Sequence, residues 1–160
     1  MAITQEMCNT FKQEVLMGVH DIRNSGTGDT LKIALYTSSA TLSKATTAYT
    51  TSNEATDSNS NYTAGGVDLV VPSGGTYPSL SNDTGFVTFN DVTISNANMT
   101  AAGALIYNST PSALQRDNTT AYTNPSVCVL NFGGDKTATD GDFTIQFPTA
   151  DYQNAIIRIG

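Results

Sequence analysis

Near its C-terminal end the chain reads Val127-Cys-Val-Leu-Asn-Phe132, followed by Gly133-Gly-Asp-Lys-Thr-Ala-Thr-Asp-Gly141 and Asp142-Phe-Thr-Ile-Gln-Phe147. Its two outer runs are apolar, β-branched or aromatic, which is typical of strands, and residues 155–160 form a third such run. The segment between the first two predicts a hairpin turn at 133–141, because Gly and Asp-Gly pairs tolerate the positive φ angles of such turns. We therefore expect three strands in the last thirty-odd residues of the chain.

One helix is predicted, over residues 4–19, with Thr4 as its N-cap. Apolar residues recur at helical spacing, while Glu14 lies off this stripe. The stripe is made of Met7, Cys8, Phe11, Val15, Leu16 and Val19. A helix this short needs a packing partner, which is either the sheet of its own chain or a neighbouring subunit. Phe11 and Val15 are the candidate contact residues in both cases.

The rest of the chain reads as short strands joined by turns and by two polar segments. Strands are predicted at residues 31–37, 67–71, 86–94 and 104–107, and the polar segments are 38–66 and 111–125. At 160 residues the chain is expected to form a single domain over 1–160. The fold class predicted is mainly β, a compact sandwich, jelly roll or barrel over residues 31–160 with one N-terminal helix.

The polar segment 38–66 is the first candidate for a binding surface. A loop of this length without structure of its own is unusual inside a compact domain unless it has a function or packs elsewhere. Its two aromatic residues are Tyr49 and Tyr62, and tyrosine is favoured at interfaces because it joins a rigid apolar ring to a polar tip. Tyr49 and Tyr62 are therefore candidate interface residues, together with Phe11 and Val15.

Charge and composition exclude several partners. The net charge is −7 with only seven Lys and Arg residues, whereas nucleic acids and anionic membranes require clustered cations. No apolar run approaches the ~20 residues of a membrane span, and the N-terminus lacks the basic and apolar regions of a secretory signal. We expect a soluble, reducing compartment, in which Cys8 and Cys128 stay reduced and buried.

Residues for catalysis or for metal binding are scarce. His20 is the single histidine, and at the end of a helix it is expected to be solvated or to cap the last turn. Asp135, Asp140 and Asp142 surround Gly141 but lack the alternating spacing of a calcium loop, so turn chemistry explains them. We expect no enzyme activity, no metal and no cofactor.

The sequence resembles small virion structural proteins of tailed bacteriophages over nearly its whole length. The segments that carry this resemblance are residues 1–5, 8–14, 18–20, 32–37, 62–66, 103–108 and 142–148. The resemblance implies assembly into a particle, as a decoration or cement protein on the outer surface of the capsid. It implies the major capsid protein and copies of the chain itself as partners, with a homotrimer expected, and a stay in the host cytoplasm during assembly.

Two other functions stay open at this point. A tail or fibre component could bind a host glycan through exposed tyrosines and Asn or Asp side chains. A virion-associated hydrolase is the weaker alternative, because the sequence offers neither a histidine pair nor a glutamate in an apolar run.

Overall fold

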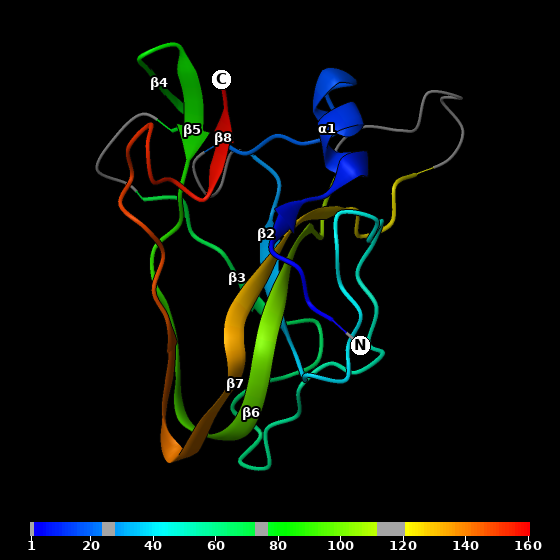
Figure 1. The fold of residues 1–160 in the computed structure, drawn as a ribbon, viewed down its shortest axis with the longest axis vertical. Helices are drawn as coiled ribbons and strands as arrows, with labels where there is room; N and C mark the ends of the chain where they lie inside the picture. Colours follow the sequence, from blue (N-terminus) through cyan, green and yellow to red (C-terminus); the bar gives the residue numbers. More distant parts are fainter. Residues whose placement is uncertain (1, 24–27, 73–76, 112–120) are drawn as a thin grey trace.

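The computed structural model describes residues 2–23, 28–72, 77–111 and 121–160, and it is mainly β (Figure 1). The strands form two antiparallel sheets, a five-stranded one in the order β1-β7-β6-β2-β3 and a three-stranded one in the order β4-β5-β8. The elements are β1 (Glu6–Met7), α1 (Asn9–Leu16), β2 (Leu31–Tyr36), β3 (Val67–Asp68), β4 (Ser79–Ser81), β5 (Thr84–Val87), β6 (Val92–Asn108), β7 (Ser126–Ile145) and β8 (Ile157–Ile159). The predicted fold class, mainly β with one N-terminal helix, is confirmed.

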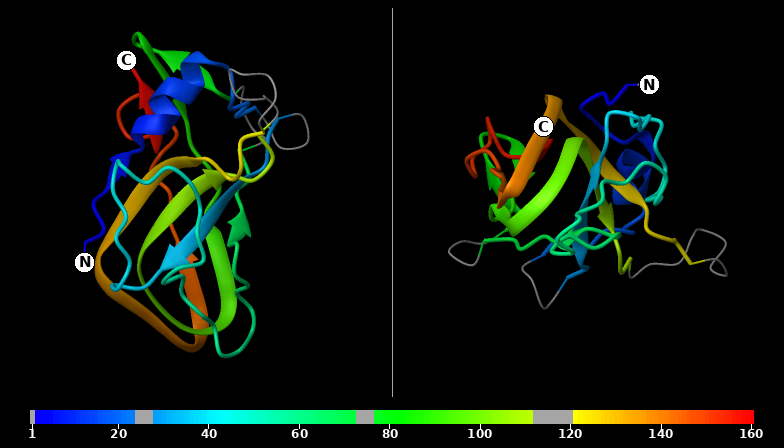
Figure 2. Two further views of the ribbon diagram at one scale, coloured as in Figure 1. Left: turned by 90° about the vertical axis from the view of Figure 1, so that its right-hand side faces the viewer. Right: turned by 90° about the horizontal axis from the view of Figure 1, so that it is seen from below.

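The expected hairpin turn at 133–141 is wrong, because β7 continues through it. β6 and β7 pair from Val92 with Ile145 to Tyr107 with Ser126, and the register shifts at several points along the way. We call this pair the bent ribbon, since both strands run downwards and turn back on themselves (Figures 1 and 2). The turn-forming residues are used for bulges within the ribbon: φ is 49° at Asp140 and 74° at Gly133. Bulges bend a strand without ending its pairing.

The strand predicted at 86–94 is divided between the two sheets. β5 ends at Val87 and belongs to the smaller sheet, whereas β6 begins at Val92 and belongs to the larger one. Between them, the amide of Asn90 donates to the carbonyl of Val70, and the hydroxyl of Thr88 donates to the carbonyl of Pro148. The run predicted at 104–107 is not a separate strand but the end of β6.

The core lies on both faces of the larger sheet. Every residue of β6 from Ala101 to Asn108 is buried, although successive side chains point to opposite faces. Segment 38–66 covers one face, where the ring of Tyr49 stacks on the ring of Tyr107. The other face meets the helix region and the smaller sheet, because His20 lies against Asn108 and α1 lines a common cavity with β5 and β8. The polar segment 38–66 therefore packs over one face of the larger sheet.

The helix is shorter than the predicted range 4–19. Residues Glu6–Met7 are extended and pair with Val129 and Cys128 of β7, so α1 begins after them, with Cys8 rather than Thr4 at the N-cap. The amide of Thr4 instead donates to the carbonyl of Leu42. Pairing with a sheet edge satisfies these backbone groups, and the helical pattern alone carries no information about that edge.

The predicted apolar stripe is also only partly right. Phe11 is 1% exposed, but Leu16, at the end of the helix, is 88% exposed. At Gly18 the backbone adopts a φ of 72°, which turns the chain back beneath the helix and buries Val19.

Candidate functional site

The structure places the two helical candidates, Phe11 and Val15, in contact with their own chain. The ring of Phe11 lies 4.9 Å from the ring of His20, centroid to centroid, and its side chain belongs to the main core. Val15 is partly buried and lines a cavity of about 200 Å³ between α1 and the smaller sheet. The helix therefore has a packing partner in the core of its own chain.

The tyrosine candidates belong to a buried cluster around Glu54, which the sequence reasoning did not single out. The hydroxyls of Tyr49 and Tyr62 each donate to Glu54, at 2.6 Å, and the amide of Gly65 donates to the same carboxylate at 2.9 Å. Tyr62 also accepts a hydrogen bond from the amide of Leu35 in β2. Because Tyr62 is only 5% exposed, its ring fastens segment 38–66 to the sheet.

Stacking extends this cluster to the bent ribbon. The rings of Tyr49 and Tyr107 are stacked with centroids 4.6 Å apart, and the hydroxyl of Tyr107 donates to the carbonyl of Gly65. Burial, together with the neighbouring Glu54 carboxylate, raises the pKa of Tyr49, Tyr62 and Tyr107 above the usual value of a phenol. These phenols are therefore protonated hydrogen-bond donors at neutral pH.

Asp57 organises the next part of the same segment. Its carboxylate accepts hydrogen bonds from the amides of Asn98, Asn59, Asn61 and Tyr62, at distances from 2.7 to 3.0 Å. These four donors lower the pKa of Asp57, with the amide of Asn98 making the largest contribution. One carboxylate thus joins a turn of segment 38–66 to β6.

The sequence suggested that His20 is solvated or caps the helix. In the structure its side chain is completely buried, in a second polar cluster. Its Nε2 lies 2.8 Å from Glu14 Oε2, and its Nδ1 lies 3.2 Å from Asn108 Nδ2. Asn108 Nδ2 can only donate, so Nδ1 accepts and Nε2 donates to Glu14. Asn108 Nδ2 also donates to Asp29, which ties the end of β6 to the segment after the helix.

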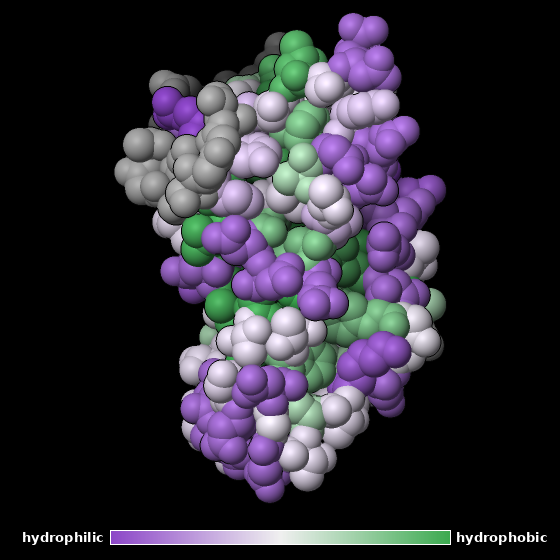
Figure 3. Space-filling model, turned by 90° about the vertical axis from the view of Figure 1, so that its left-hand side faces the viewer, coloured by the Kyte–Doolittle hydropathy of each residue, from purple (hydrophilic) through white to green (hydrophobic). Residues whose placement is uncertain are grey.

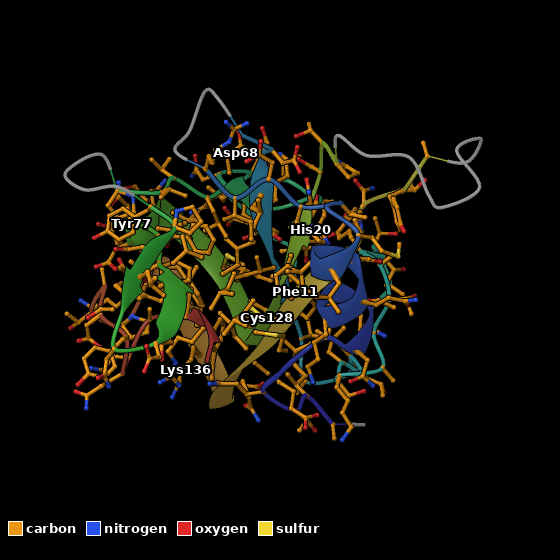
Figure 4. The ribbon with its side chains drawn as sticks, turned by 90° about the horizontal axis from the view of Figure 1, so that it is seen from above. Phe11, His20, Asp68, Tyr77, Cys128 and Lys136 are labelled. Carbon is orange, nitrogen blue, oxygen red and sulfur yellow. The ribbon has the colours of Figure 1, made fainter. Side chains whose placement is uncertain are left out.

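The sequence signal for this cluster was present but ambiguous. A charged residue off the apolar stripe is normally taken to face water. Glu14 is instead buried, and its carboxylate is bonded to the His20 ring. In Figure 4, Phe11, His20 and Cys128 lie close together between α1 and the sheet. Both ring nitrogens of the buried His20 side chain have partners within the chain, so this cluster joins the helix to the end of β6.

The two cysteines are free and buried, as expected. Burial raises the pKa of Cys8 and raises that of Cys128 to about 12, so both thiols are protonated at neutral pH. Protonated, buried thiols are poor nucleophiles and poor metal ligands.

The aspartates near Gly141 do not converge on a metal site. Asp140 accepts a hydrogen bond from Asn59 Nδ2, and Asp142 accepts one from the amide of Asn96. Within residues 2–23, 28–72, 77–111 and 121–160, no three His, Cys, Asp or Glu side chains are grouped in a way that could hold a metal ion. These aspartates stabilise the bend of the ribbon.

A hollow lies between the two arms of β7, and we call it the β7 groove. Its volume is about 540 Å³, which falls within the usual range of ligand sites. It is lined by Gln5, Leu130, Asn131, Phe132, Lys136, Thr137, Asp142, Phe143, Thr144, Ile145, Gln146, Phe147, Pro148 and Ile156. Sequence reasoning missed it because it depends on the bend, which brings residues 130–137 and 142–148 to face each other.

Aromatic side chains give the β7 groove apolar walls. The rings of Phe132 and Phe143 lie 6.4 Å apart across the two arms, and Phe147 packs edge-on against Phe89 at 5.6 Å. On the side of the molecule that carries the second arm, apolar side chains lie exposed among polar ones at mid-height (Figure 3). Lys136 lies away from the His20 cluster (Figure 4), so the β7 groove and the buried polar cluster are separate.

The chain matches no protein-family model, no curated protein and no solved structure. Among the helices of the part described, none has the length and apolar character that crossing a membrane requires. The candidate site is therefore assigned on its geometry alone.

Proposed function

We propose that the chain is a virion structural protein of a tailed bacteriophage, most specifically a decoration or cement protein on the outer surface of the capsid. The observation that carries the proposal is the β7 groove, a hollow of about 540 Å³ that is lined by both aromatic and polar residues. The resemblance of the sequence to small virion structural proteins is the reason for proposing a phage particle as the assembly that the chain joins. The partners proposed are the major capsid protein and further copies of the chain, as a homotrimer.

The internal use of the reactive side chains supports a role in binding over a role in catalysis. The His20 imidazole is held by Glu14 and Asn108, and the Glu54 carboxylate is held by two tyrosines. A hydrolase needs an acid, a base or a nucleophile that can reach its substrate, and neither of these two clusters offers one.

A cement protein stabilises a shell through many modest contacts that act together. One copy that buries about 800 Å² on each partner forms a specific interface of standard size. Repetition over the shell multiplies this effect, because each copy restrains capsid subunits that its neighbours also restrain. Threefold closure would let a single surface of the chain be used three times in each trimer.

The copy number in purified particles tests the proposal. We expect near-stoichiometric amounts of the chain relative to the major capsid protein in DNA-filled particles, and the same ratio after the tails are removed. A few copies that leave with the tails would contradict the capsid role. That result would favour the alternative of a tail or fibre component, for which the Asn131, Gln146 and Asp142 side chains of the groove offer polar contacts to a glycan.

A further inference from the structure

The outer edge of β7 is open beside the groove. β6 pairs with one side of β7 from Ser126 to Ile145, with interruptions at residues 132–135 and 139–140, whereas β1 covers the other side only at Cys128 and Val129. Between Phe132 and Ile145 no strand of the described residues lies on that side. An open edge of this kind presents backbone donors and acceptors that can pair with another extended chain.

The protein already uses the first part of this edge to hold an extended segment of its own. Beyond β1, the amide of Asn131 donates to Gln5 Oε1 at 3.4 Å, and Asn131 Nδ2 donates to the carbonyl of Ile3 at 2.7 Å. The β7 groove begins next to Gln5, where this contact ends. A strand in the groove would therefore continue an existing pairing along the same edge.

The side chains of β7 indicate the charge of the occupant. Asp142 and Lys136 line the groove, and two further aspartates of this part of the strand, Asp135 and Asp140, are exposed beside it. Two copies of the chain that met edge to edge here would bring like charges together, and each copy carries a net charge of −7. This disfavours a second copy and favours a partner segment with basic residues beside its apolar ones.

We propose that the β7 groove binds an extended segment of the partner protein, which adds a strand to the outer edge of β7 between residues 132 and 145. Its apolar side chains lie against Phe132, Phe143 and Phe147, and its basic side chains flank them near the aspartates. The backbone hydrogen bonds supply affinity, and the apolar walls supply selectivity. A helix could not occupy the edge in this way, because its backbone groups are already paired within it.

This inference rests on the proposed function, since the partner protein is the one that the chain binds in the particle. Hydrogen exchange followed by mass spectrometry tests it, with the free protein compared with the protein bound to purified heads. We expect the outward-facing amides of residues 132–145 to exchange more slowly in the bound protein. Each amide that gains a hydrogen bond should slow by roughly fivefold to tenfold. The amides of α1 serve as an internal reference.

Two outcomes would overturn the inference without affecting the proposed function. One is protein bound to heads in which exchange of residues 132–145 is unchanged. The other is protection of the same residues in the isolated protein as its concentration rises, with dimers in sedimentation, which would make a second copy the occupant. Failure of the proposed function is distinct, because the protein would then not be found on heads at all.

Substitution of the groove wall gives an independent readout. Phe132→Lys places a charge in the groove, and Leu80→Lys is its matched control on β4, where Leu80 is already exposed outside the groove. Added to heads that lack the protein, the Phe132→Lys variant should bind at least tenfold more weakly than wild type, and Leu80→Lys should bind like wild type. Equal binding of the two variants would contradict the inference, and circular dichroism establishes that both are folded. The exchange experiment on wild-type protein decides the matter even where Phe132→Lys does not fold.

Discussion

At the scale of single residues, Asp57 makes the stability of the protein depend on pH. The four backbone amides bound to its carboxylate hold the pKa in the folded protein below the ordinary value of 3.8. The unfolded chain therefore binds more protons than the folded one between these two pKa values. The contribution of Asp57 is fully present above about pH 4 and is lost as the pH falls through the pKa of the folded state.

We expect Asp57→Asn to lower the melting temperature at pH 7, because an amide group replaces a carboxylate that accepts four hydrogen bonds. We also expect the variant to lose less stability than wild type between pH 5 and pH 3. Thermal unfolding at a series of pH values measures both effects. Asp83→Asn, at an exposed turn between β4 and β5, is the control. Parallel pH curves for wild type and Asp57→Asn would show that Asp57 does not carry the acid dependence.

Tyr62 gives the second prediction at this scale. Its hydroxyl donates to Glu54 and accepts from the amide of Leu35, and both partners are buried. Tyr62→Phe leaves these groups without that bond, which should lower the free energy of unfolding by about 1–3 kcal/mol. Urea denaturation measures the change. The same substitution at Tyr152, whose hydroxyl makes no hydrogen bond to the described residues, should change stability by less than about 0.5 kcal/mol.

At the level of elements, α1 is stabilised mainly by the packing of one side chain, Phe11, and less by the helix propensity of its residues. Phe11 is almost completely buried, whereas Leu16 in the last turn is exposed. We expect Phe11→Ala to destabilise the protein by about 3–5 kcal/mol and Leu16→Ala to have an effect near zero. Chemical denaturation of the two variants gives the comparison. A Phe11→Ala protein with the stability of wild type would mean that α1 packs on a partner in solution, and not on its own chain.

The same elements show what the sequence could and could not predict. Alternation and turn residues were sufficient for the fold class and for β2, because these signals are local. The bent ribbon was missed because Gly133 and Asp140 suit a hairpin turn and a bulge equally well, and only pairing with β6 decides between them. The length of the helix was overestimated for a similar reason, since residues 6 and 7 take their structure from a distant strand.

The candidate site was harder to predict than the fold. Tyr49 and Tyr62 were selected as candidate interface residues, but within the chain their hydroxyls bind Glu54, which no motif marks. His20 needed the turn at Gly18 to bring it beneath the helix. The β7 groove joins side chains from two arms of one strand, and only the bend of that strand brings them together.

At the scale of the whole molecule, the bent ribbon should make the two sheets unfold as one unit. β6 and β7 run through the larger sheet, and the ends at Val92 and Ile145 share a single core with Val87 and Ile157 of the smaller one. Neither sheet can lose its packing without exposing apolar side chains of the other, so we expect two-state unfolding. The transitions followed by tyrosine fluorescence, to which the tyrosines of the Glu54 cluster contribute, and by far-ultraviolet circular dichroism should therefore coincide in urea. A separate early transition in either signal would contradict two-state unfolding of the two sheets.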